Sequence, residues 1–122
     1  MLSDQFRELT RYLHAFNEMQ LDSLRARSCG SGVDPFLCEL VTRFIDEEHE
    51  RRYRRHRPLK FIQVAAQPQD VLARAAAAAQ QLAVDLSSQR PDPLTSTEWL
   101  PVGVFLEQLA MRLQQTAQVE GR

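Results

Sequence analysis

Apolar residues recur at helical spacing in four stretches of the chain, and these stretches predict four helices. In residues 3–27 the apolar positions lie three or four residues apart, which places them on one face of a helix. The same spacing recurs within residues 34–57, 69–87 and 97–117. The sequence therefore predicts an all-α fold, an up-and-down bundle of about four helices that forms a single domain over residues 1–122.

Large apolar residues from all the predicted helices are expected to meet in one core. The expected core residues are Leu9, Leu13, Leu40, Phe44, Leu82, Phe105 and Leu109. The small side chains of the run Ala75 to Ala79 should let a neighbouring helix approach closely. A chain of 122 residues is long enough to bury one such core.

Local signals mark where several of these helices begin and end. Asp34 followed by Pro35 is a strong start signal, because the carboxylate accepts hydrogen bonds from first-turn amides and proline fits the first helical position. Pro58 disfavours helical geometry at the residue before it and should end this helix at Arg57. A glycine-rich turn before Asp34 makes the first two helices an antiparallel hairpin. Residues 59–64 fit a short extended segment, a loop or a helical turn.

The second predicted helix changes character half-way along its length. From Asp46 to Arg57 its only large apolar side chain is Tyr53, whereas its first half has a broad apolar face. Acidic residues precede arginines by four positions here, the favourable order for helical ion pairs. The expected pairs are Glu47 with Arg51, Glu48 with Arg52, and Glu50 with Arg54. Beyond these pairs Arg55, His56, Arg57 and Lys60 have no acidic neighbours, so we interpret residues 46–57 as a charged arm with a basic end.

We expect a small non-catalytic protein-interaction module, of the adaptor, chaperone-like or regulatory kind, that uses the charged arm and leftover apolar surface of the bundle. Its partner would be another protein with an acidic patch, or a second copy of the chain. The candidate contact residues are Arg51, Arg52, Tyr53, Arg54, Arg55, Arg57, Lys60 and Trp99. Two alternatives remain open for these residues. In the first alternative, the arm is only a solvated helix end and Trp99 is a lid over the core. In the second, residues 51–60 contact nucleic acid, although the net charge of -1 disfavours such a partner.

The sequence predicts no catalytic, cofactor or metal site. Asp46 and His49 have the spacing of one half of a carboxylate-bridged di-metal motif, but matching acidic residues on other helices are missing. We find no glycine-rich phosphate loop and no nucleophile turn. We therefore expect that the protein is not an enzyme.

The two cysteines and the apolar runs bear on location. Cys29 and Cys38 lie nine positions apart and lack the partners of a zinc site, so we expect two free thiols. No apolar run approaches the roughly 20 residues that span a bilayer, and no secretory signal is recognisable. These features predict a cytoplasmic protein without membrane contact.

Overall fold

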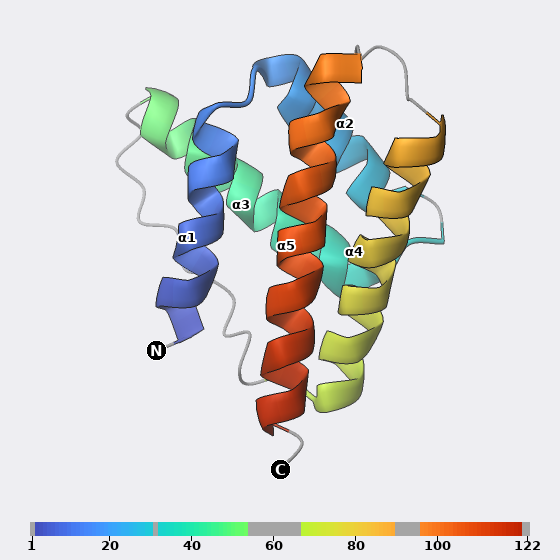
Figure 1. Ribbon diagram of the computed structural model, residues 1–122. Helices are drawn as coiled ribbons and strands as arrows, with labels where there is room; N and C mark the ends of the chain where they lie inside the picture. Colours follow the sequence, from blue (N-terminus) through green and yellow to red (C-terminus); the bar gives the residue numbers. More distant parts are fainter. Residues whose placement is uncertain (1, 31, 54–66, 90–95, 121–122) are drawn as a thin grey trace.

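Helices alone make up the regular structure of the described part of the chain. The computed structural model describes residues 2–30, 32–53, 67–89 and 96–120, and over these residues it has five helices and no strand. The helices are α1 Leu2–His14, α2 Glu18–Ser28, α3 Pro35–Tyr53, α4 Gln69–Gln89 and α5 Ser96–Glu120. In Figure 1, α4 and α5 run antiparallel, and α3 crosses obliquely behind α1 and α5. The predicted all-α bundle is confirmed.

One hydrophobic core joins all five helices. Six of the seven expected core residues belong to it, and the seventh, Leu82, is partly buried and packs against it. The Phe105 ring makes edge-to-face contacts with Phe16, which lies between α1 and α2, and with Phe44 of α3. Ala75 and Ala79 of α4 are fully buried, as expected for alanines at a close helix contact.

The predicted single helix over residues 3–27 is wrong, because the chain turns between His14 and Glu18 and forms two helices. Asn17 begins α2 with a reciprocal capping box. Its side chain accepts from the backbone amide of Gln20 at 2.8 Å, and the Gln20 side chain accepts from the Asn17 amide at 2.7 Å. These bonds satisfy two amides that a new helix start would leave without partners. The pattern Asn-x-x-Gln was the sequence signal for this break.

The other helix bounds match their predictions closely. Helix α5 is continuous from Ser96 and contains Pro101, so the predicted start ahead of the proline is correct. Helix α3 begins at Pro35 as expected, with Asp34 accepting a hydrogen bond from the amide of Leu37 at 3.1 Å. The predicted end of this helix at Arg57 and the segment 59–64 lie outside the described residues.

A disulfide links the end of α2 to the first turn of α3, so the expectation of two free thiols is wrong. Cys29 directly follows α2, and Cys38 lies on α3, with their Cα atoms 4.7 Å apart. The loop between them turns through Gly32, whose φ of 82° is a conformation that favours glycine. Spacing alone did not reveal the pairing, because only the turn brings the two cysteines together.

This disulfide predicts that reduction weakens the fold. The bond closes a loop across nine positions, and a cross-link of that size stabilises by about 2 to 3 kcal/mol. Urea unfolding with and without reductant should show that loss of free energy. The Cys29→Ser/Cys38→Ser double variant should be insensitive to reductant. Two titratable thiols in native protein purified without reductant would contradict the pairing.

Candidate functional site

Glu48 is the most deeply buried charged residue described, and it lies where α3 meets α1. Only 2% of its surface is exposed. It continues the buried face of α3 that includes Val41 and Phe44, at positions seven and four residues earlier. Because a buried carboxylate must be paired, this position requires positive partners. Arg51 and Arg52 supply them, with nitrogen to oxygen distances of 2.7 Å and 2.6 Å.

The Arg52 guanidinium holds three helices together. It donates to Glu48 on α3 and to Glu18 at the start of α2, each at 2.6 Å. It also donates to the backbone carbonyl of Leu13 at 3.0 Å and to that of Phe16. Leu13 lies in the last turn of α1, where its carbonyl also accepts from the amide of Phe16 at 3.0 Å, and Phe16 lies in the turn between α1 and α2. Arg52 therefore serves as a side-chain cap for α1 and fixes the turn into α2.

Two histidines extend this ion cluster, which we define as Glu18, Glu48, Arg51 and Arg52. His14 Nε2 lies 3.5 Å from Glu48, and His49 Nε2 lies 3.1 Å from Glu18. Polar contacts around Glu48 and Glu18 thus connect α1, α2 and α3. A second pair, Arg25 with Asp46 at 3.3 Å, also ties α2 to α3.

The ion cluster sets the charge state of Glu48. Burial by itself would raise the pKa of this carboxyl, but hydrogen bonds from Arg51 and Arg52, together with their positive charges, outweigh burial and hold the pKa below its ordinary value of 4.5. A carboxyl whose pKa is lowered by folding stabilises the fold above its ordinary pKa. This contribution is lost as the pH falls below 4.5 and through the lowered value.

The structure separates the predicted contact residues into different environments. The Arg51 side chain is 50% exposed and the Arg52 side chain only 19%. The expected pair of Glu48 with Arg52 is confirmed. Tyr53 is exposed at the end of α3, with its ring centroid 5.8 Å from that of His49. Arg54, Arg55, Arg57 and Lys60 lie outside the described residues. Arg52 thus has an internal role that the sequence did not indicate, while its predicted part in partner binding stays a prediction.

Trp99 lies near the start of α5 and packs against the core while remaining partly exposed. Its indole nitrogen is buried and makes no hydrogen bond within the described part of the molecule. The neighbouring Glu98 is held from α2, because its backbone carbonyl accepts from Gln20 and its carboxylate from Asn17, each at 2.9 Å. This position fits a lid over the core.

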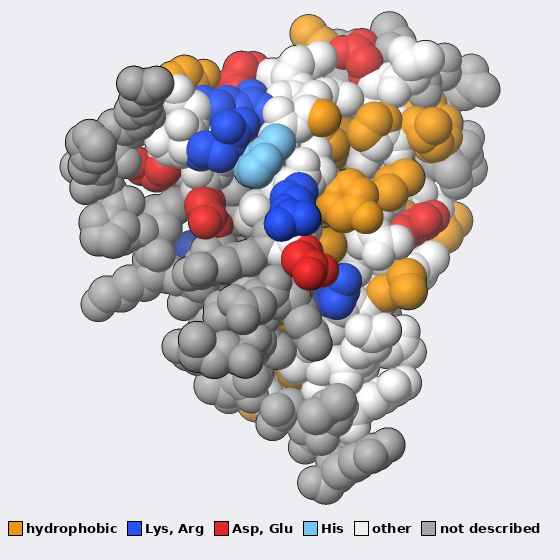
Figure 2. All heavy atoms as spheres, turned by 60° about the vertical axis from the view of Figure 1, so that its left-hand side comes forward, with side chains coloured by type: hydrophobic (Ala, Val, Ile, Leu, Met, Phe, Trp, Pro, Cys, Tyr) orange, Lys and Arg blue, Asp and Glu red, His pale blue; other side chains and the backbone are white. Residues whose placement is uncertain are grey.

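A row of large apolar side chains lies on the outer face of α5. Leu100 is 55% exposed and Met111 is 51% exposed, and Val104 is also exposed. At 100° per residue these three side chains point away from the core, opposite to Leu106 and Leu113. Tyr12 of α1 adds a fourth exposed apolar side chain. Figure 2 shows hydrophobic side chains gathered on one side of this face, next to a band of basic ones. We call Tyr12, Leu100, Val104 and Met111 the apolar row.

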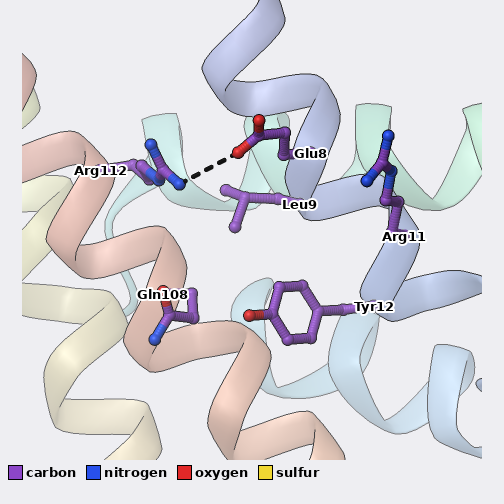
Figure 3. A pocket seen from close by; sticks show the side chains of 6 residues that line it. All are labelled: Glu8, Leu9, Arg11, Tyr12, Gln108 and Arg112. Atoms are coloured by element: carbon purple, nitrogen blue, oxygen red, sulfur yellow. Dashed lines mark hydrogen bonds and ion pairs between the residues drawn. The ribbon is translucent and has the colours of Figure 1, made fainter.

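A groove between α1 and α5 borders the apolar row. Its lining residues are Glu8, Leu9, Arg11, Tyr12, Gln108 and Arg112. Glu8 and Arg112 form an ion pair across it at 3.3 Å, and the Tyr12 ring extends from α1 toward α5 (Figure 3). Leu9 is almost fully buried, so the floor of the groove is apolar. Leftover apolar surface was expected from the sequence but not assigned to particular residues; the spacing of Leu100, Val104 and Met111 was the available signal.

The half-motif Asp46-x-x-His49 takes part in contacts between helices. Asp46 pairs with Arg25, and His49 lies against Glu18, so both side chains face α2. Over the residues with described placement, no group of three or more histidine, cysteine, aspartate or glutamate side chains is arranged to hold a metal ion.

Comparisons with protein-family models, with curated proteins and with solved structures each gave no match. Within the described ranges, no helix combines the length and apolar character needed to cross a membrane.

Proposed function

We propose that this protein is a small protein-interaction module that binds its partner through the apolar row on α1 and α5. The observation that carries the proposal is the exposure of Leu100, Val104 and Met111 on one face of one helix. Single exposed apolar residues are normal, but several together on one face are typical of interaction sites.

The surroundings of the row support this proposal. Glu107 lies beside it on α5, and Arg11 and Arg112 lie along its α1 side. An apolar centre with a charged rim is the usual composition of a protein interface. The ion cluster adds rigidity, because Arg52 fixes the end of α1 two residues after Tyr12. A surface held in place before binding loses less conformational entropy when a partner binds.

In this proposal the charged arm has a smaller part in partner binding than was predicted from the sequence. Between residues 46 and 53 it has four acidic residues and two arginines, and both arginines bond to Glu48. This part of the arm is therefore poorly suited to phosphate contacts, which reduces the support for a nucleic-acid partner. A protein with an acidic patch and a second copy of the chain remain the proposed partners. The predicted cytoplasmic location also loses support, because disulfides are typical of oxidising compartments.

Site-specific photo-crosslinking tests the proposal. A photoreactive amino acid at Val104 should form covalent adducts with a protein partner in the native host. The matched control is Val84 on α4, which is also an exposed valine inside a helix but lies outside the apolar row. Adducts formed in excess at position 104 would support the interaction module. Equal yields at both positions, or adducts with nucleic acid alone, would contradict it.

A further inference from the structure

The apolar row has opposite charges on its two sides. Arg11 on α1 lies on one side of it, and Glu107 on α5 lies on the other. Both residues are exposed, and neither forms an ion pair with any residue whose side chain is described. By contrast, Arg112 in the same groove is already paired with Glu8. Arg11 and Glu107 are therefore the charges available to a partner at this surface.

The two charges lie at about the same level along α5. Arg11 and Gln108 line the same groove from opposite helices, and in Figure 3 the Arg11 side chain extends along the outer side of α1. Glu107 precedes Gln108, so it lies about 1.5 Å further along the helix axis and about 100° around it. This rotation carries Glu107 to the side of the apolar row that faces away from α1.

This arrangement is self-complementary under one kind of twofold symmetry. A twofold axis parallel to α5 places the α1 side of one copy against the opposite side of the other copy, at the same level. Arg11 then faces Glu107 of the second copy, and the same contact occurs a second time by symmetry. Val104 and Met111 meet their own counterparts along the axis. A twofold axis perpendicular to α5 would instead bring the two Arg11 side chains together, which like-charge repulsion disfavours.

We infer that the partner of the apolar row is a second copy of this chain, bound through parallel packing of the two α5 helices with reciprocal contacts between Arg11 and Glu107. This inference rests on the proposed function and names its partner. In this dimer the apolar row forms the centre of the interface, and the contacts between Arg11 and Glu107 determine how the two copies are oriented relative to each other.

Sedimentation velocity over a range of micromolar concentrations tests for the second copy. The chain of residues 1–122 should sediment as a dimer at the upper end of the range. Val104→Glu should raise the dissociation constant at least about tenfold, because it places a carboxylate at the centre of an apolar contact. Val84→Glu makes the same change on α4 and should leave the dissociation constant unchanged.

Charge exchange tests the orientation. Arg11→Glu and Glu107→Arg should each weaken self-association at least about tenfold, because each creates two repulsive contacts in the dimer. An equimolar mixture of the two variants should dimerise again, because both contacts become attractive between unlike chains. Glu39→Arg, an exposed charge reversal on α3, should have no effect alone or in mixtures. Thermal unfolding of each variant checks that the fold is retained.

The outcomes separate this inference from the proposed function. A monomer at every concentration overturns the inference, while crosslinking of Val104 to a different protein would leave the interaction module standing. The parallel arrangement is overturned if Val104→Glu leaves the dissociation constant of the dimer unchanged. It is also overturned if the mixture of Arg11→Glu and Glu107→Arg does not dimerise. A monomer without excess crosslinking at Val104 contradicts both proposals.

Discussion

Replacing Arg52 with methionine is expected to lower the free energy of unfolding by about 3 to 5 kcal/mol. The substitution keeps the apolar stem of the side chain but removes the guanidinium. Glu48, which is 2% exposed, would then lose its most buried positive partner. The carbonyls of Leu13 and Phe16 would lose the donor that caps α1. The loss arises because Glu48 would keep only the half-exposed Arg51 as a partner and the Phe16 carbonyl would lose the donation from Arg52, and buried polar groups that lose a partner cost free energy.

Arg51 provides the control for this prediction, because it bonds to the same carboxylate from the neighbouring position on α3. Its side chain is half exposed, so Arg51→Met should lower the free energy of unfolding much less than Arg52→Met. Urea unfolding of the two variants and the parent chain at neutral pH measures the difference. Similar losses for Arg51 and Arg52 would show that Arg52 does not have the internal role assigned to it.

Replacing Phe44 with alanine is the second change with a large expected effect, a loss of about 3 to 5 kcal/mol in the free energy of unfolding. Phe44 is fully buried, and its ring lies edge-to-face against Phe105 with centroids 5.7 Å apart. Truncation removes this contact and leaves a cavity where α3 packs against α5. Neighbouring helices close such a cavity only in part, so the loss exceeds the transfer free energy of the missing atoms.

Tyr53 is the matched control for this core prediction, because it is an aromatic residue on the same helix with an exposed side chain. Tyr53→Ala should change the free energy of unfolding by less than about 1 kcal/mol. Denaturant unfolding monitored by helical circular dichroism compares the two variants. A small loss for Phe44→Ala would mean that α3 does not pack through this face.

Much of the fold could be predicted from local pattern, and the failures have a physical explanation. The apolar spacing in α3, α4 and α5 identified their buried faces, because only one face of a helix can meet a core. The break at Asn17 was missed because apolar spacing continues across it, and its capping bonds compete with helix continuation only at short range. Glu48 was placed among solvated charges, although it continues the stripe of Val41 and Phe44. A pattern of residue types does not state which neighbouring helix will cover a given turn.

The apolar spacing of the sequence by itself determined that this chain forms helices with one buried face each, because that spacing leaves no other regular structure able to bury its apolar side chains. Tertiary structure alone decided which charges became internal. The approach of α1 and α2 to the end of α3 turned Glu48 and Arg52 into a buried pair, and the turn at Gly32 brought Cys29 to Cys38. Packing also left Leu100, Val104 and Met111 uncovered, because the core-facing side of α5 is occupied by the other helices. Such pairings depend on the distance between segments far apart in the chain, which local spacing does not specify.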